Sequence, residues 1–573
     1  MTKQEYNFRY PIEYMDDKTE IKKNVLEDLE LIKFNNPDEE QQGIMEQVIE
    51  PRTIFGKKCI GELCKYTTTN KKFLKDTQCI VQKFPSIIQN DVLHDKMASI
   101  WFGLVNDNNF IDKYKYVDVQ FFRKLNNSSL FLQLLSIYNL SSPMMFFIVP
   151  VIMLLVPFFL LKMKRLDVSM NSYVSILKKV LKNHTLGLLI NTNYKDINWG
   201  TAVYVIFSIG FYLFQMYQNV LSCINYYKNM YKIHDYIFTV KDYLLETHRN
   251  IDAIQSTYSH YASYTTFTNT MVNYKKDIHD FIKELDSITV LKINFGKLSQ
   301  LGYIMKQFYR FYNDTHVHQL IDFSFHLNGY MDYMVQIHGL MKSKKINKCT
   351  FGKNTKMKKA YYAKLIHEKY VANDYNFKKN MIITGPNAAG KTTLIKTAVI
   401  NIIFSQQIGF GFYKSAVLNP YDHIHSYLNI PDTSGRDSLF QAEARRCKEI
   451  LNEFSHHGKA RHFCIFDELY SGTNPYEAVG SAYGFLKYIS LNKNVDFMIT
   501  THYGQLCSLM DNERNMENKH MKIELLDNNY TFNYTYKLAS GISQVKGGFK
   551  VLKDLEYPED LLNNILSIMD VLI

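Results

Sequence analysis

The chain has 573 residues and a formal net charge of +12, and 46% of its residues are hydrophobic while 21% are charged. This balance is typical of a globular protein with several domains, and it excludes an intrinsically disordered chain. Of the 67 basic residues, 56 are lysines. This excess fits either an AT-rich coding sequence or an anionic partner. The eight cysteines are scattered without zinc-ligand spacing, which predicts free thiols in a reducing compartment.

The texture of the sequence changes along the chain and predicts six segments. In chain order these are a polar amino-terminal segment (1–50), a first helical core segment (51–142), a membrane hairpin (143–217), a second helical segment (218–341), a Lys-rich linker (342–359) and an α/β domain (360–573). The helical segments repeat apolar residues at three and four positions, whereas short β-rich runs alternate with helical runs after residue 360. The expected fold is therefore a carboxyl-terminal α/β domain preceded by a mostly α-helical region that contains two transmembrane helices.

Two uncharged hydrophobic runs carry the membrane prediction. Pro143–Leu161 has 19 residues, enough to cross ~30 Å of hydrocarbon, and basic residues follow it at once. Trp199–Tyr217 is also uncharged, with aromatic residues near both ends. The alternative is a pair of buried core helices. The topology is inconsistent, because loop 162–198 holds seven basic residues against two aspartates and should be cytoplasmic, whereas a hairpin places it opposite the flanking regions. We favour a hairpin with both large regions cytosolic.

The segment 342–359 contains eight lysines in eighteen residues. Such a run is most often a solvated linker. The alternative is a patch that contacts phosphates.

The sharpest motif is a glycine-rich loop between a short apolar strand, Met381–Thr384, and a helical run. It fits the full G-x-x-x-x-G-K-T pattern of a phosphate-binding loop. Its backbone N–H groups and the helix N-terminus would hold the β-phosphate, Lys391 would reach the β- and γ-phosphates, and the Thr392 hydroxyl would ligate Mg²⁺. The predicted nucleotide-binding residues of the loop are Gly385, Pro386, Asn387, Ala388, Ala389, Gly390, Lys391, Thr392 and Thr393.

Two later strand ends supply the predicted chemistry. The apolar run 463–466 ends in Asp467 and Glu468. We assign Asp467 to the metal ion and Glu468 to the general base that deprotonates the attacking water. A third apolar strand ends before His502, which could contact the γ-phosphate and sense its loss. The predicted catalytic residues are therefore Lys391, Glu468 and His502, with ATP and Mg²⁺ as ligands.

Taken together, these motifs resemble the MutS family, a branch of the ABC-type ATPases. The loop 385–393 resembles that family's GPN-x-x-GK-[ST]-T loop, the segment 467–474 its DE-x-x-x-GT-[SN] segment, and residues 500–503 its THY switch. Gly435–Glu443 resembles the family's G-x-ST-F-x-x-E stretch. The resemblance covers about 360–560, and a weaker one begins at Pro51. The mismatch-reading amino-terminal domain of repair members is not recognised.

The resemblance implies further residues and a partner. Tyr370 and Val371 lie in a segment that resembles the one packing on the adenine. The family's ATP site is composite, which implies a homodimer or a heterodimer with a paralogue. Ser438 of one subunit would then face the γ-phosphate bound by the other. The end of the chain resembles the family's return strand and dimerisation helices.

Two functions are open on this sequence. The favoured one is a membrane-anchored ATPase switch with its ATPase domain in the cytosol. The alternative is a DNA-binding mismatch repair or recombination ATPase, cytoplasmic or nuclear, with the apolar runs buried. Any DNA binding would be independent of sequence, and it would weaken steeply with salt.

Overall fold

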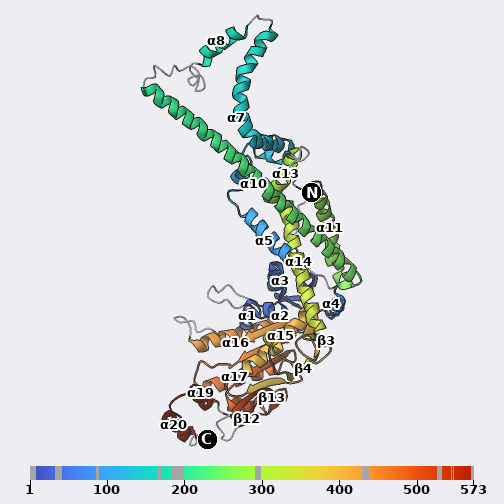
Figure 1. Cartoon of the computed structure of the whole chain (residues 1–573). Helices are drawn as coiled ribbons and strands as arrows, with labels where there is room; N and C mark the ends of the chain where they lie inside the picture. The colour runs from blue at the N-terminus through green and yellow to red at the C-terminus, as the bar shows by residue number, and fades with distance from the viewer. Residues whose placement is uncertain are drawn as a thin grey trace. The chain divides into compact units, whose positions relative to one another are not determined.

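The computed structural model divides into two compact units (Figure 1). The first comprises Met1–His94, Thr247–Lys275 and Asp322–Ile573, and the second comprises Asp95–Glu246 and Lys276–Ile321. The structure describes residues 8–32, 42–85, 89–164, 169–181, 199–290, 298–428, 430, 438–525, 532–543, 545 and 547–569.

The second unit is built from helices. Its described elements are α6 (Phe110–Lys113), η2 (Arg123–Asn127), α7 (Ser129–Met163), α8 (Met170–Leu181), α13 (Leu301–Asn313) and parts of α5 (Asp91–Val105), α10 (Trp199–Tyr258), α11 (Thr265–Asp286) and α14 (Thr315–Lys342). Gly302 lets α13 approach the start of α7 closely, since a Cβ there would lie 2.1 Å from the Ser129 carbonyl oxygen. The Gly302 N–H donates to Gln133 Oε1 at 2.7 Å. The Phe110 and Tyr312 rings stack with centroids 4.1 Å apart beside this contact region.

The prediction of two transmembrane helices is wrong. Among the residues that the structure describes, no helix combines the length and apolar character needed to cross a membrane. The first uncharged run is the later part of α7, which begins at Ser129, and the second is only the start of the 60-residue α10. Both helices extend well beyond these runs into sequence rich in polar residues, and α10 buries Tyr226, Ile233 and Val240. The hydropathy of each uncharged run alone therefore does not represent the helix that contains it, which is why the prediction failed.

The first unit also has a helical part, whose segments all precede its α/β part in the chain. It contains η1 (Pro11–Tyr14), β1 (Lys18–Glu20), α1 (Lys23–Asp28), α2 (Ile44–Ile49), α3 (Ile54–Leu63), β2 (Tyr66–Thr68), α4 (Lys71–Lys83), η3 (Ala262–Tyr264) and the remaining parts of α10, α11 and α14. Thr53 caps α3 by accepting a bond from the Gly56 N–H at 3.0 Å. Buried Asp332 of α14 accepts bonds from both the N–H and the hydroxyl of Thr53, at 2.8 and 2.9 Å. These bonds fix α3 against α14.

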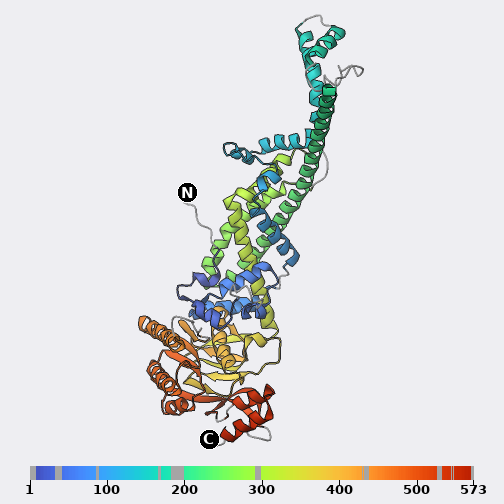
Figure 2. The same cartoon turned by 90° about the vertical axis from the view of Figure 1, so that its left-hand side faces the viewer.

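A six-stranded, mostly parallel sheet forms the centre of the α/β part (Figure 1 and Figure 2, yellow to red). In spatial order its strands are β13 (Phe532–Ser540), β12 (Met516–Leu525), β6 (Asn380–Thr384), β11 (Val495–Thr500), β10 (His462–Asp467) and β9 (His423–Tyr427). Only β13 runs antiparallel to its neighbour. All five residues of β6 are buried, as expected for a central parallel strand. The helices α16 (Leu439–His456), α17 (Pro475–Ser490) and α18 (Gly504–Met510) share one apolar cluster with this sheet.

A second sheet and one buried helix complete the domain. The sheet order is β5 (Asn373–Asn376), β4 (Lys356–Ala360), β8 (Ser415–Leu418), β3 (Asn347–Phe351) and β7 (Phe410–Gly411). The segment predicted as a Lys-rich linker thus contains β3 and β4. Helix α15 (Lys391–Ile408) contacts strands of both sheets, which explains why nearly all of its side chains are buried. The remaining elements are η4 (Ala363–Leu365), α19 (Gly548–Asp554) and α20 (Glu559–Met569).

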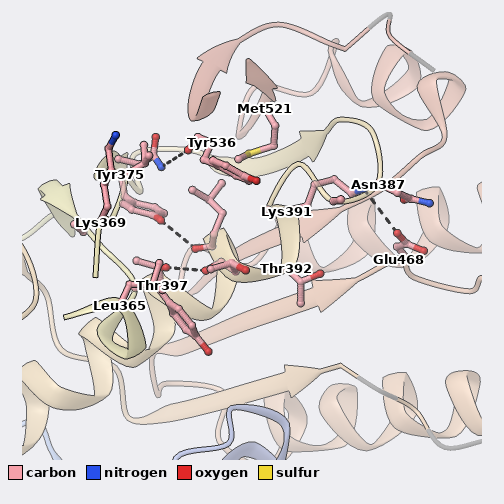
Figure 3. Close-up of a pocket in the computed structure, with 18 residues that line it drawn as sticks. Leu365, Lys369, Tyr375, Asn387, Lys391, Thr392, Thr397, Glu468, Met521 and Tyr536 are labelled. Carbon is pink, nitrogen blue, oxygen red and sulfur yellow. Dashed lines mark hydrogen bonds and ion pairs between the residues drawn. The ribbon is translucent and has the colours of Figure 1, made fainter. Parts of the chain in front are cut away.

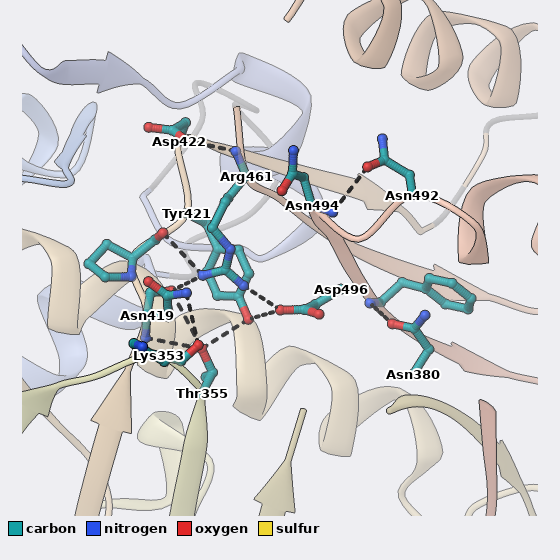
Figure 4. A network of polar contacts seen from close by, with 12 residues as sticks. Lys353, Thr355, Asn380, Asn419, Tyr421, Asp422, Arg461, Asn492, Asn494 and Asp496 are labelled. Carbon is teal, nitrogen blue, oxygen red and sulfur yellow. Dashed lines mark hydrogen bonds and ion pairs between the residues drawn. The ribbon is translucent and has the colours of Figure 1, made fainter. Parts of the chain in front are cut away.

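A polar network centred on Arg461 ties the two sheets together (Figure 4). The Arg461 guanidinium pairs with Asp496 at 2.7 Å, donates to the Asn419 carbonyl oxygen at 2.6 Å and lies 4.4 Å from the Tyr421 ring centroid. The Tyr421 hydroxyl donates to Asp496 at 2.7 Å, and its oxygen lies 3.0 Å from the Thr355 hydroxyl. Burial raises the pKa of Asp496, and the Tyr421 and Arg461 bonds oppose that shift. This network is a structural link and contributes none of the predicted site residues.

Candidate nucleotide-binding site

The predicted phosphate-binding loop joins β6 to α15. Gly385 and Gly390 both have positive φ, at 155° and 86°, and Ala388 between them has φ of 61°. Gly390 is the N-cap of α15, and a Cβ on it would lie 3.2 Å from the Tyr536 ring. The loop therefore requires glycine at this position for both its backbone conformation and its close neighbour. The loop leads straight into the N-terminus of α15, and a glycine-rich loop before a helix N-terminus is an arrangement that binds anions.

Lys391 lies buried at the first position of α15. Its ammonium donates to the carbonyl oxygens of Gly385 at 3.1 Å and Pro386 at 3.3 Å. It also lies 3.1 Å from His502 Nε2 and 4.0 Å from Glu468 Oε1. Burial lowers the pKa of Lys391, while the charges of Glu468 and Asp467 act in the opposite direction. The ammonium is thus held at the loop, next to two other predicted residues.

Asp467 and Thr392 meet at the carboxyl ends of parallel strands. The Thr392 hydroxyl donates to Asp467 Oδ2 at 2.7 Å, and the Thr500 hydroxyl donates to Asp467 Oδ1. Strands β6, β11 and β10 are neighbours, so their ends bring these side chains together. A hydroxyl and one carboxylate fit Mg²⁺, which keeps waters and substrate phosphates as its other ligands. Among the described residues, no group of three or more His, Cys, Asp or Glu side chains is placed to hold a metal ion.

Glu468 occupies a constrained position directly after β10. Its φ is 52°, in the left-handed region, and its N–H donates to the Thr500 carbonyl oxygen at 3.1 Å. Its carboxylate Oε1 lies 2.8 Å from His502 Nε2. This contact lowers the pKa of Glu468, the positive charge of Lys391 lowers it further, and burial opposes the shift. The carboxylate is therefore ionised at neutral pH, as a general base must be.

A cavity of about 530 Å³ opens beside the loop (Figure 3). Its lining includes Asn387, Ala388, Gly390, Lys391, Thr392, Thr393 and Glu468 from the predicted set, and also Val371. The other predicted adenine-packing residue, Tyr370, is not among the lining residues. Its ring stacks on Tyr361 with centroids 4.0 Å apart.

Sequence reasoning missed two lining residues that come from late in the chain, Met521 of β12 and Tyr536 of β13. Asn373 positions Tyr536, because its amide donates to the Tyr536 carbonyl oxygen at 3.0 Å and accepts from the Leu538 N–H at 2.8 Å. Asn373 lies two residues after Val371, inside the stretch 370–374 that resembles the family's adenine-packing segment. In the sequence, Asn373 is only a polar residue near Val371. Nothing there indicates that it contacts Tyr536, which lies more than 160 residues later.

Ser438 lies at the N-terminus of α16, apart from this cavity. It caps the helix, with its hydroxyl accepting from the Gln441 N–H at 3.3 Å, and it is exposed. Gly435, the start of the predicted stretch, lies outside the described residues. Because Ser438 is not among the lining residues, its role toward a nucleotide stays a prediction.

Glu443 connects α16 to the loop that follows Glu468. This buried carboxylate accepts bonds from the Ser471 N–H at 3.1 Å, the Ser471 hydroxyl at 3.0 Å and the Gly472 N–H at 3.1 Å. The start of α16 and the strand end that bears Glu468 are therefore mechanically linked within one subunit.

Comparisons with known proteins agree on the carboxyl-terminal part. Residues 381–572 match the family MutS domain V. The DNA mismatch repair protein MutS of Leuconostoc mesenteroides is 28% identical over 204 residues, 35% of this chain and 23% of that protein. The DNA mismatch repair protein MutS of Orientia tsutsugamushi is 29% identical over 223 residues, 38% and 24% of the two chains. Endonuclease MutS2 of Finegoldia magna is 27% identical over 246 residues, 42% and 27%. The chain spans about a quarter of the length of these curated relatives.

Proposed function

We propose that this chain, whose residues 381–572 match the family MutS domain V, is an ATP hydrolase that acts on DNA and uses ATP to switch between conformations. The observation that carries the proposal is the convergence of Lys391, Thr392, Asp467, Glu468 and His502 beside one cavity. A phosphate loop, a metal-suited pair and an ionised carboxylate are the parts that phosphoryl transfer to water requires.

The chain's own residues would divide the work as follows. The N–H groups of the 385–390 loop bind the phosphates, and Lys391 exchanges its carbonyl partners for phosphate oxygens. Thr392 and Asp467 would hold Mg²⁺, which neutralises developing phosphate charge when bound. Glu468 accepts a proton from the attacking water. The water oxygen bonds to the γ-phosphorus, and the bond between the γ-phosphorus and the bridging oxygen breaks, so that the electron pair leaves with the β-phosphate. His502, at 2.8 Å from Glu468, orients that carboxylate.

The base of the nucleotide would lie between the two sheets' edges. Tyr536 offers an aromatic face there, and Val371 and Met521 add apolar surface. Stacking on an aromatic ring together with apolar contacts suits a planar base. We assign this role to Tyr536 ahead of Tyr370, because only Tyr536 lines the cavity.

The active form would be a dimer. Ser438 is exposed at a helix N-terminus and does not line its own cavity, which suits a residue that completes the site of a partner subunit. The partner would be a second copy of this chain or a paralogue, since either can supply the serine. Glu443 and Gly472 would then transmit closure at Ser438 to Glu468 in the same subunit.

The DNA part of the proposal is supported by the relatives' names. Two of the relatives are called DNA mismatch repair proteins. The matched region is the nucleotide-binding part, so the DNA-contacting residues have to be identified on this chain itself.

The test of the ATPase is Glu468→Gln, compared with Glu524→Gln as a matched control. Glu524 is an exposed residue of β12 outside the cavity lining. We expect Glu468→Gln to bind ATP normally and to accumulate as a closed dimer, while turnover falls by about 10²–10⁴-fold. Glu524→Gln should match the wild type. Wild-type turnover in Glu468→Gln would remove Glu468 from its assigned role, and no ATP turnover by the wild type would refute the function.

A further inference from the structure

Nearly all of the chain's net charge resides in one short stretch. Residues 342–379 contain twelve lysines and two acids, Glu368 and Asp374, a net charge of +10 in a chain whose total is +12. A coding bias toward lysine would add lysines throughout the chain, and it would not exclude acids from one stretch. The stretch therefore calls for a local explanation.

The fold gathers these lysines on the exposed face of the five-stranded sheet. Along β4 the burial alternates, with Met357 buried and Lys356 and Lys358 exposed. The pairing of β4 with β8, and of β8 with β3, places Lys348 on the same face as Lys358. The opposite face is apolar and buried, and it includes Cys349 and Tyr375. The three lysines thus point to solvent because the sheet's other side is committed to the core.

Four more exposed lysines surround this face in sequence and structure. Lys353 lies in the β3–β4 turn, Lys378 and Lys379 follow β5, and the Lys414 N–H donates to the Lys358 carbonyl oxygen beside β8. We call the seven residues the basic sheet face, namely Lys348, Lys353, Lys356, Lys358, Lys378, Lys379 and Lys414.

The ammonium groups of the basic sheet face contrast with those of Lys396 and Lys487, two paired lysines of the same unit. Within the described part of the chain, none of the seven forms an ion pair. By contrast, Lys396 pairs with Glu30 at 2.7 Å and Lys487 with Glu513 at 3.0 Å. Seven unpaired like charges on and around one face repel one another, and an anionic partner relieves that repulsion.

We propose that the basic sheet face binds the phosphate backbone of DNA without reading its sequence. Neighbouring strands lie ~4.8 Å apart, so Lys348 and Lys358, two strands apart, are separated by roughly 10 Å across the sheet. Duplex DNA carries one charge per ~1.7 Å of axis, about six phosphates over that length. All seven residues are lysines, which contact phosphate as point charges and lack the arginine fork that reads guanine. This inference rests on the proposed function, since it supplies the DNA contact which that function needs.

The sheet that carries this face also borders the nucleotide cavity, through buried residues such as Tyr375 on its opposite face. Ala360, at the end of β4, and Lys369 and Asn373, in the connection to β5 and its first residue, line that cavity. The β4–β5 connection therefore joins the strand that carries Lys356 and Lys358 to residues that line the cavity. We expect DNA to change the rate of ATP turnover through this connection.

The experiment compares two triple variants of the full chain that remove equal charge. The test variant is Lys348→Gln, Lys356→Gln and Lys358→Gln. The control is Lys71→Gln, Lys72→Gln and Lys75→Gln, three exposed lysines of α4 in the same unit. Fluorescence anisotropy with a labelled 40-base-pair duplex gives Kd over a range of salt concentrations. Circular dichroism and ATP turnover without DNA check the fold of each variant.

We expect the test variant to weaken DNA binding about tenfold or more at 0.1 M salt, and to reduce the slope of log Kd against log salt by about 3. The control should stay within about twofold of the wild type, and turnover without DNA should be unchanged in both. Equal losses in the two variants, or wild-type affinity in the test variant, would overturn the inference. A wild type that binds no duplex would also overturn the inference. The same holds if the test variant loses binding to phosphatidylserine vesicles but retains DNA binding.

The two proposals fail separately. If the wild type binds DNA through this face but hydrolyses no ATP, the basic sheet face stands and the proposed function falls. If turnover is normal and Glu468→Gln abolishes it, while the test variant binds DNA like the wild type, the ATPase stands and the basic sheet face falls.

Discussion

Gly472→Ala tests the link between the strand end that bears Glu468 and the helix that begins at Ser438. A Cβ at position 472 would lie 2.7 Å from Leu439 Cγ and 2.8 Å from both Leu439 Cβ and the Phe440 backbone nitrogen. Ordinary van der Waals contact begins at 3.4 Å. Either the 471–472 loop or the start of α16 must therefore move by roughly 0.6–0.7 Å. Since a backbone atom of α16 is among the contacts, the first turn of α16 moves with it.

The expected magnitudes follow from that displacement. An added methyl group in a packed contact costs about 1–3 kcal/mol of unfolding free energy. Displacement of a functional group by about 1 Å can reduce turnover by about 10²-fold. We therefore expect kcat of Gly472→Ala to fall about 10- to 100-fold by a phosphate-release assay. ATP affinity should change little, because the lining residues other than Glu468 lie on other segments than the β10–α17 connection that holds Gly472.

Gly480→Ala is the matched control. Gly480 lies on α17, and a Cβ there meets no atom within 4 Å. Alanine in an exposed helix position stabilises by about 0.5–1 kcal/mol relative to glycine, so this variant should unfold at slightly higher urea and keep wild-type turnover. If Gly472→Ala matched Gly480→Ala in both assays, the reasoning that α16 and the 471–472 loop move together would be refuted.

Two further predictions concern the cavity. Tyr536→Ala should weaken ATP binding by about 1–3 kcal/mol, roughly 5- to 150-fold in Kd measured with a fluorescent ATP analogue, whereas Tyr370→Ala should change it less than about threefold; the reverse order would return the adenine contact to Tyr370. The His502 contact and the Lys391 charge lower the pKa of Glu468 from its ordinary 4.5, so the ionised carboxylate stabilises the fold above that pH and this contribution is lost as pH falls through the lowered pKa. His502→Ala should therefore move the acid limb of the turnover–pH profile to higher pH, and an unmoved limb would show that Glu468 does not set it.

The sequence predicted the centre of the site because its residues sit in contiguous motifs at strand ends. Lys391 and Thr392 follow the loop after β6, Asp467 ends β10 with Glu468 next to it, and His502 lies two residues after β11. In a parallel sheet these ends share one edge, so strand adjacency alone brings the side chains together. Apolar runs bounded by glycine and acids are enough to locate such strands.

Contacts set by distant pairing could not be predicted. Tyr536 reaches the cavity through the β12–β13 pairing, which contains a register shift at Lys522 and Ile523, and through its bonds to Asn373. No local pattern encodes that register. The membrane prediction failed for the opposite reason, because it relied on a local average over part of a longer helix.

The amino-terminal segment, predicted only as polar, proves to join the two helices on which the proposed composite site depends. Asp28 of α1 accepts a bond from Ser426 at 2.5 Å and lies 3.5 Å from Arg446 of α16, while Glu30 pairs with Lys396 of α15 at 2.7 Å. Helix α15 begins at Lys391 and α16 begins at Ser438. A shift of one helix relative to the other must stretch these contacts. Asp28 and Glu30 thus tie the amino-terminal segment to both α16 and α15.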